Sequence, residues 1–176
     1  MSTKMLKPIT IALLLVLVIG CGLDFDSPHP SDDSLIKNFK THEADFDMLA
    51  RMCQENSNLI RIAPDFTWTD KSVAWPRPES ELGFSRQRWD EYRSLFRKLE
   101  LKSGILNYQP DLVLFLASTK GLVTGGSMKG YAYSVKAPPL ITESLDDYRF
   151  KAPIKDINIA YRKLKGNWYL FYETDN

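Results

Sequence analysis

Two stretches of the chain carry apolar residues at helical spacing. In the first, between Ser31 and Asn56, one face recurs at alternating steps of four and three residues, at Leu35, Phe39, His42, Phe46, Leu49 and Cys53. This period predicts an amphipathic helix. Ser31 suits the N-cap of that helix, and Asp32 and Asp33 in its first turn favour the positive end of the helix dipole.

The second helix is predicted to begin after Ser85 as its N-cap. Phe84 precedes this cap and faces Trp89 as a hydrophobic staple. The apolar face of the helix consists of Trp89, Tyr92, Leu95, Phe96 and Leu99. Lys102-Ser103-Gly104 predicts its end.

After Gly104 the hydrophobic period changes to two, which predicts strands. The predicted strands are Leu59–Ala63 before the second helix and, after it, Leu112–Ala117, Leu122–Thr124, Ser127–Val135, Asp156–Lys163 and Trp168–Glu173. Turns are predicted at Ser118–Gly121 and Lys165–Asn167, and a β-bulge at Gly125-Gly126. Helices followed by strands with short turns predict an α+β fold, with two amphipathic helices packed on one face of a mainly antiparallel sheet.

The N-terminus has the features of a targeting signal. Lys4 and Lys7 precede an apolar run of about eleven residues, which is shorter than the roughly twenty residues that a membrane-spanning helix needs. The run ends in Val18-Ile19-Gly20-Cys21, which resembles the lipobox of bacterial lipoproteins. The resemblance implies that the Cys21 thiol receives a diacylglycerol, that the chain is cut before Cys21, and that fatty acyl groups such as palmitate hold the protein in a membrane. The alternative is an uncleaved signal anchor in which Cys21 is incidental.

These features divide the chain into a signal peptide of residues 1–20, a tether of residues 21–30 and one globular domain of residues 31–176. The whole chain has 23 Lys and Arg against 22 Asp and Glu, so it is close to neutral with or without the signal peptide. No polybasic segment indicates a nucleic-acid partner. If Cys21 is lipidated, Cys53 has no disulfide partner in the chain, and its place on an apolar helix face predicts burial.

The residue types that support metal or acid–base chemistry are few. The chain has two histidines: His29 lies between prolines in the tether, where it is not expected to hold a ligand geometry, and His42 is expected to be a core histidine rather than a buried base. No metal or other cofactor is predicted. The acidic pairs Asp146-Asp147 and Glu79/Glu81 lie in loop-like segments, where solvated turn residues are the usual explanation.

Two glycine-containing patterns also fall short of a known motif. Gly125–Gly130 contains Ser127 but lacks the second glycine of a G-x-S-x-G nucleophile elbow. The same segment is a weak candidate for an anion-binding nest near Lys129, because it lacks the pattern of a phosphate-binding loop. No catalytic residue is therefore assigned.

Aromatic residues concentrate in the last predicted strands. Alternate residues of Trp168–Glu173 fall on opposite faces, with Trp168, Leu170 and Tyr172 on one and Tyr169, Phe171 and Glu173 on the other. One face can pack on the helices, so the other is either covered by residues 64–83 or exposed. An exposed face would make a candidate binding surface of Tyr131, Tyr133, Tyr169 and Phe171.

The sequence therefore predicts a lipoprotein of the cell membrane or outer membrane, anchored by its lipid and facing outside the cytoplasm, whose domain binds a partner rather than catalysing a reaction. The expected partners are the membrane and an envelope protein, an inhibited enzyme or a cell-wall component. The alternative is a small envelope hydrolase or transferase that uses Asp146, Asp147 or His42. A small-ligand carrier is a third interpretation, and the sequence does not specify the biochemical activity.

Overall fold

The computed structural model describes residues 28–56, 59–69, 73–74, 84–109, 111–122, 125–148 and 159–175. The predicted signal peptide and residues 21–27 of the predicted tether lie outside these ranges. The helices are α1 (Asp32–Thr41), α2 (Glu43–Glu55) and α3 (Arg86–Lys98). The strands are β1 (Leu59–Ile62), β2 (Thr67–Thr69), β3 (Val73–Ala74), β4 (Ile105–Gln109), β5 (Leu112–Leu122), β6 (Gly125–Ser134), β7 (Ile159–Lys165) and β8 (Trp168–Asp175).

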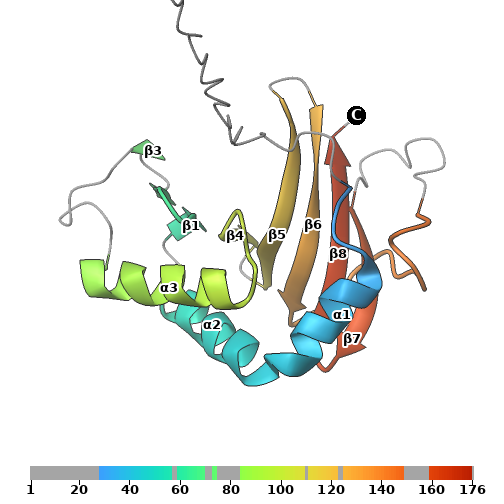
Figure 1. Cartoon of the computed structure of the whole chain (residues 1–176), viewed down its shortest axis with the longest axis horizontal. Coiled ribbons are helices and arrows are strands. Elements are labelled where there is room, and N and C mark those ends of the chain that lie inside the picture. Colours follow the sequence, from blue (N-terminus) through green and yellow to red (C-terminus); the bar gives the residue numbers. More distant parts are fainter. Residues whose placement is uncertain are drawn as a thin grey trace, which may run out of the picture.

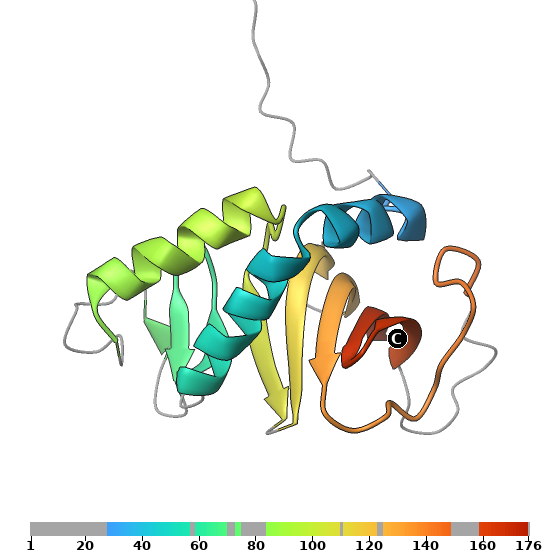
Figure 2. The same ribbon diagram turned by 90° about the horizontal axis from the view of Figure 1, so that it is seen from below.

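The eight strands form one sheet in the order β3-β2-β1-β4-β5-β6-β8-β7, and neighbouring strands are antiparallel throughout. The three helices lie together on one face of this sheet (Figures 1 and 2). The predicted α+β class, with helices packed on one face of an antiparallel sheet, is confirmed. None of these three helices is long and apolar enough to cross a membrane.

The first predicted helix is broken in two at His42, which has φ −124° and ψ 24°. The His42 N–H closes α1 by donating to the carbonyls of Asn38 and Phe39, and the His42 carbonyl accepts from the first turn of α2. The break changes the direction of the chain (Figure 1). Phe39 on α1 and Phe46 on α2 consequently both pack on the ring of Trp168, with centroid distances of 5.5 and 5.6 Å.

The second predicted helix, α3, begins as the sequence indicates. The Ser85 Oγ accepts from the Arg88 N–H at 3.2 Å, as expected of an N-cap. The helix ends earlier than predicted, because Glu100 adopts the left-handed conformation with φ 57° and the Leu101 N–H then bonds back to the Phe96 carbonyl at 2.8 Å. This is the Schellman arrangement that closes many helices, here without the usual glycine.

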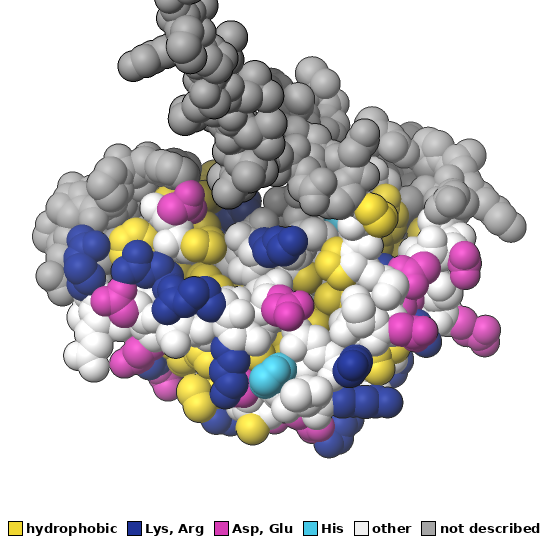
Figure 3. All heavy atoms as spheres, in the orientation of Figure 1, with side chains coloured by type: hydrophobic (Ala, Val, Ile, Leu, Met, Phe, Trp, Pro, Cys, Tyr) yellow, Lys and Arg dark blue, Asp and Glu magenta, His cyan; other side chains and the backbone are white. Residues whose placement is uncertain are grey.

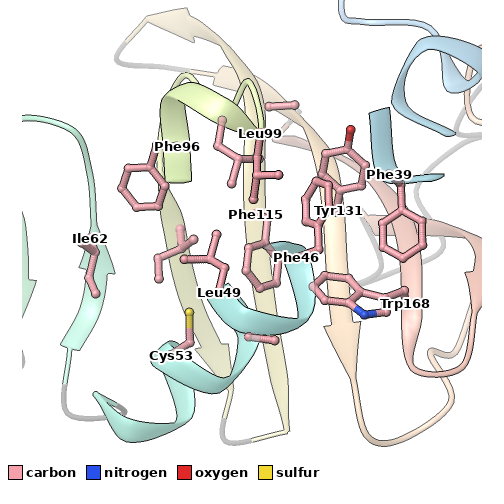
Figure 4. Packing of buried hydrophobic residues seen from close by; sticks show 14 of the residues in the cluster. Phe39, Phe46, Leu49, Cys53, Ile62, Phe96, Leu99, Phe115, Tyr131 and Trp168 are labelled. Carbon is pink, nitrogen blue, oxygen red and sulfur yellow. The ribbon is translucent and has the colours of Figure 1, made fainter. Parts of the chain in front are cut away.

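The main hydrophobic core lies between the helices and the sheet (Figure 4). Phe46, Leu49, Ile62, Leu99, Phe115 and Tyr131 in this core have no exposed surface. Cys53 is 1% exposed, and burial raises the pKa of its thiol well above the ordinary value. Its predicted burial is confirmed, and a thiol in this state is unreactive.

A second buried cluster lies on the opposite face of the sheet. It consists of Leu114, Leu116, Ala132, Tyr161, Tyr169 and Phe171. The predicted alternation along β8 is confirmed, since Trp168 and Leu170 belong to the helix-side core and Tyr169 and Phe171 to this second cluster. The predicted cover, residues 64–83, falls largely outside the described residues.

Strand β5 is longer than predicted. Ser118–Gly121, which were expected to form a turn, continue the strand to Leu122 and pair with β6. Pairing with the neighbouring strand satisfies the backbone groups of this segment, and the expected bulge falls between Leu116 and Ser118 rather than at Gly125-Gly126. This extension carries the polar side chains described next.

Candidate functional site

Two serines and two lysines form a polar group at the ends of β5 and β6. Ser118 lies opposite Lys129 and Lys120 opposite Ser127 in the antiparallel register. Because side chains two residues apart share a face, these four side chains lie on the same side of the sheet as the helices. We call Ser118, Lys120, Ser127 and Lys129 the Ser/Lys quartet.

The imidazole of His29 lies across this quartet. Its Nδ1 is 2.5 Å from the Ser118 Oγ and its Nε2 is 2.7 Å from the Ser127 Oγ. The ring also meets the Tyr172 ring edge to face, with a centroid distance of 5.6 Å. The prediction that His29 has no fixed geometry was wrong, because two hydroxyls on strands distant in sequence bind both of its nitrogens.

His29 is neutral near pH 7. Burial, followed by the positive charges of Lys120 and Lys129, lowers the pKa of its imidazole to about 4. A neutral imidazole has one N–H donor and one acceptor nitrogen. One of the two serines therefore donates its proton to the ring, while the other accepts from the ring and keeps its own proton for another partner.

A buried ion network borders the quartet. The Asp32 carboxylate, with a side chain 2% exposed, lies 2.8 Å from the Lys129 Nζ and 2.9 Å from the Arg162 Nη1. The Asp32 Oδ2, which contacts Arg162, also accepts from the Leu145 N–H at 2.8 Å. Lys129 reaches Asp146 as well, and the Asp32 N–H donates to both Asp146 oxygens. We call Asp32, Lys129, Asp146 and Arg162 the Asp32 network.

The network balances its own charge. Burial acts to raise the pKa of Asp32, but hydrogen bonds from Leu145, Lys129 and Arg162 outweigh it, and the pKa lies below the ordinary value. Two carboxylates therefore face two cations. Lys120, by contrast, has no carboxylate partner in the described ranges, so it is the uncompensated charge of the quartet.

Several of these groups line a pocket of about 570 Å³. Its wall includes His29, Lys120, Lys129, Asp146, Tyr148 and Tyr172. We call it the His29 pocket. Its wall combines the Lys120 ammonium group, the Ser31 hydroxyl and two tyrosine side chains, which is the composition of a site for a small polar ligand.

The structure does not bring the four predicted surface aromatics together. Tyr131 and Tyr133 lie on the helix side of the sheet, and Tyr169 and Phe171 lie on the other. Tyr131 and Phe171 have no exposed surface and Tyr169 is 5% exposed. These three side chains therefore pack in the interior and form no exposed surface with Tyr133.

The residues considered for catalysis are also dispersed. His42 lies between α1 and α2 and is half-buried rather than in the core, and it contacts the Asp45 carboxylate at 3.5 Å, an acid partner of the kind expected. Asp146 joins the Asp32 network, whereas Asp147 is exposed and bonds to Ser144. Glu79 and Glu81 lie outside the described residues.

The weak candidate for an anion-binding nest does not form. Residues Gly125–Ser134 are strand β6, in which the backbone groups pair with β5 and β8 instead of converging on an anion. Lys129 is held by Asp32 and Asp146 and is not free to serve such a nest.

A repeated pattern in the sequence marks the quartet. Ser-x-Lys-Gly occurs at 118–121 and again at 127–130. Its period-two spacing places serine and lysine on one face of each strand, and two copies on paired strands produce the alternating quartet. His29 gives no comparable signal, because its partners lie 89 and 98 residues away in the chain.

No family model, curated protein or solved structure matches the chain. Within the described ranges, no group of three His, Cys, Asp or Glu residues is placed to hold a metal ion. The interpretation of the site therefore depends on its own geometry and charge.

Proposed function

We propose that this protein is an extracytoplasmic lipoprotein anchored through Cys21, and that its domain binds a small ligand in the His29 pocket. The observation that carries the proposal is the fixed, neutral His29 between Ser118 and Ser127 beside the uncompensated Lys120. His29, Lys129 and Asp146 in this wall are held in place before the ligand arrives, which lowers the entropic cost of binding.

The same geometry supports binding over catalysis. A general base works best when its pKa is near the working pH, and a pKa of about 4 makes His29 a weak base at neutral pH. The Asp32 and Asp146 carboxylates are bound to cations and are poorly suited to transfer protons.

An envelope hydrolase or transferase is the second candidate. The 2.7 Å contact between the His29 Nε2 and the Ser127 Oγ favours it, since a nucleophile and its base must lie within hydrogen-bond distance. Covalent labelling of Ser127 by a fluorophosphonate probe would identify this function, whereas the binding proposal expects Ser127 to stay unlabelled.

Native mass spectrometry of the protein extracted from membranes tests the pocket. We expect a bound small molecule on the wild-type protein and its loss from Lys120→Met, which keeps the apolar stem but removes the ammonium group. Lys40→Met is the matched control, because Lys40 is an exposed lysine on α1 outside the pocket. A wild-type protein without a bound molecule, or equal occupancy in both variants, contradicts the proposal.

Cys21→Ala tests the anchor. If acyl groups on Cys21 hold the protein in the membrane, this variant leaves the membrane fraction, because stable anchoring depends on those chains. Fractionation followed by immunoblotting measures the change, with Cys53→Ala as the control that retains the anchor. Cys21→Ala protein that stays in the membrane fraction indicates an uncleaved signal anchor.

A further inference from the structure

We infer that the His29 pocket binds an oxyanion, a phosphate or carboxylate group, and that Lys120 is its charged contact. This inference deepens the proposed function and rests on it. It names the chemistry that the pocket recognises, whether the oxyanion belongs to a lipid headgroup or to a soluble molecule.

The groups that the pocket offers to a ligand are mainly donors. Lys120 contributes an ammonium group with three N–H bonds. The Ser31 hydroxyl is also part of the wall, and its Oγ accepts from the Ser34 N–H at 3.3 Å, which leaves its own O–H as a donor. An ammonium group and a hydroxyl on one wall match the oxygens of an anion, and a charged hydrogen bond is the stronger of the two.

The carboxylates near the pocket do not neutralise Lys120. Asp146 lines the pocket, but its oxygens accept from the Asp32 N–H at 3.1 and 2.9 Å and one of them also contacts the Lys129 ammonium. Asp32 is buried behind Lys129 and Arg162. The Asp32 network carries no net charge. The net charge of the described groups around the pocket is therefore the single positive charge of Lys120.

Several Lys and Arg side chains elsewhere on the surface have carboxylate partners, unlike Lys120. Figure 3 shows Lys and Arg side chains gathered over α3. Three cations of α3 have carboxylate partners: Arg88 with Glu55, Arg93 with Asp90 and Lys98 with Asp45. Lys120 combines a place in the pocket wall, neighbouring hydroxyls and the lack of such a partner among the described residues.

The pocket lies where the chain enters the domain. His29 is part of its wall, and the eight residues from Cys21 to His29 span at most about 28 Å. A lipid on Cys21 would therefore keep the pocket close to the headgroups of the bilayer. A lipid phosphate and a soluble oxyanion are the two sources of this chemistry, and the experiment separates them.

The test is a calorimetric titration of the full-length protein in detergent with inorganic phosphate, acetate and uncharged glucose. We expect phosphate or acetate to give a heat of binding and glucose to give none. Lys120→Met should weaken oxyanion binding about tenfold or more, because a hydrogen bond from a charged donor is lost. Lys120→Arg should stay within about threefold of wild type, and Lys40→Met should match wild type.

The source of the oxyanion is read from two further titrations. Glycerol phosphate in solution is compared with vesicles of phosphatidylglycerol, and vesicles of phosphatidylcholine serve as the reference for a phosphate masked by a cation. Binding to glycerol phosphate alone supports a soluble ligand, and stronger binding to phosphatidylglycerol supports a headgroup; Lys120→Met must weaken either one.

Two outcomes overturn the inference. Oxyanions that bind wild type and Lys120→Met equally exclude Lys120 as the contact. If neither phosphate nor acetate binds while native mass spectrometry finds a bound molecule, the pocket binds an uncharged ligand. That result supports the proposed function and contradicts the oxyanion inference. If calorimetry and native mass spectrometry both detect no binding, the proposed function is contradicted as well.

Discussion

Replacing Asp32 with alanine is expected to lower the free energy of unfolding by about 3–5 kcal/mol. The side chain is 2% exposed and binds Lys129, Arg162 and the Leu145 N–H. Its removal leaves the buried Lys129 ammonium with Asp146 alone and the Leu145 N–H without an acceptor, and an uncompensated buried charge is costly. Urea unfolding followed by circular dichroism measures the change.

Asp33→Ala is the matched control for this prediction. Asp33 is exposed in the same first turn of α1, so it shares the interaction with the helix dipole but not the network. We expect it to cost less than about 1 kcal/mol. Adding Lys129→Met to Asp32→Ala should recover part of the loss, because it removes the stranded cation. Equal effects of Asp32→Ala and Asp33→Ala would show that the network does not stabilise the fold.

Gly130→Ala is expected to lower the free energy of unfolding by more than about 3 kcal/mol or to prevent folding. A Cβ atom on Gly130 would lie 2.0 Å from the Phe115 carbonyl oxygen and 2.8 Å from the Ala117 nitrogen, and both are backbone atoms. Neither can move aside without separating β5 from β6 next to the Ser/Lys quartet. Soluble yield, near-ultraviolet circular dichroism and urea unfolding report the loss.

Gly166→Ala provides the comparison for Gly130→Ala. A Cβ on Gly166 would meet no atom within 4 Å, and the expected cost of about 1–2 kcal/mol comes only from its φ of 53°. The difference between the two variants isolates the close approach of β5 and β6. A Gly130→Ala protein as stable as Gly166→Ala would mean that these strands are farther apart than described.

The parts of the fold that sequence predicted well depend on local signals. Helix α3 has an N-cap at Ser85 and an apolar face whose Trp89, Tyr92 and Phe96 are buried, and all of this is encoded within about fifteen residues. The hairpin at Lys165–Asn167 is likewise specified by a turn between two alternating segments. Local capping and periodicity determine such elements.

The parts that sequence did not predict depend on contacts between distant residues. The break at His42 lets two phenylalanines pack on Trp168, and periodicity along one helix does not report this contact. Ser118 and Lys120 were predicted to lie in a turn, because the polar segment that contains them is typical of one. They belong instead to strand β5, because they pair with residues of β6. Strands β2 and β3 have three and two residues, too short for a periodic pattern.

The site was missed for the same reason. His29 and Asp32 come from the start of the domain, while their partners lie on β5, β6 and β7 and in the segment at Leu145. No local pattern links these positions. The repeated Ser-x-Lys-Gly identifies the quartet, but not the histidine that completes it.

The neutral state of His29 also makes stability depend on pH. The pKa of a solvated histidine is about 6.5, and in the folded protein that of His29 is about 4, so the unfolded chain binds a proton that the folded protein does not. The contribution of His29 to stability is therefore complete above about pH 6.5 and is lost as the pH falls toward 4.

The imidazole itself offers the most direct test of the claim that the start of the domain closes a ligand pocket. Nitrogen-detected NMR of the full-length protein in detergent micelles follows the protonation of His29 between pH 3 and 8. A midpoint near pH 4, with both ring nitrogens hydrogen-bonded above it, is the predicted result. A midpoint near the value of about 6.5 for a solvated histidine would contradict the account, because it would place His29 in water rather than between Ser118 and Ser127.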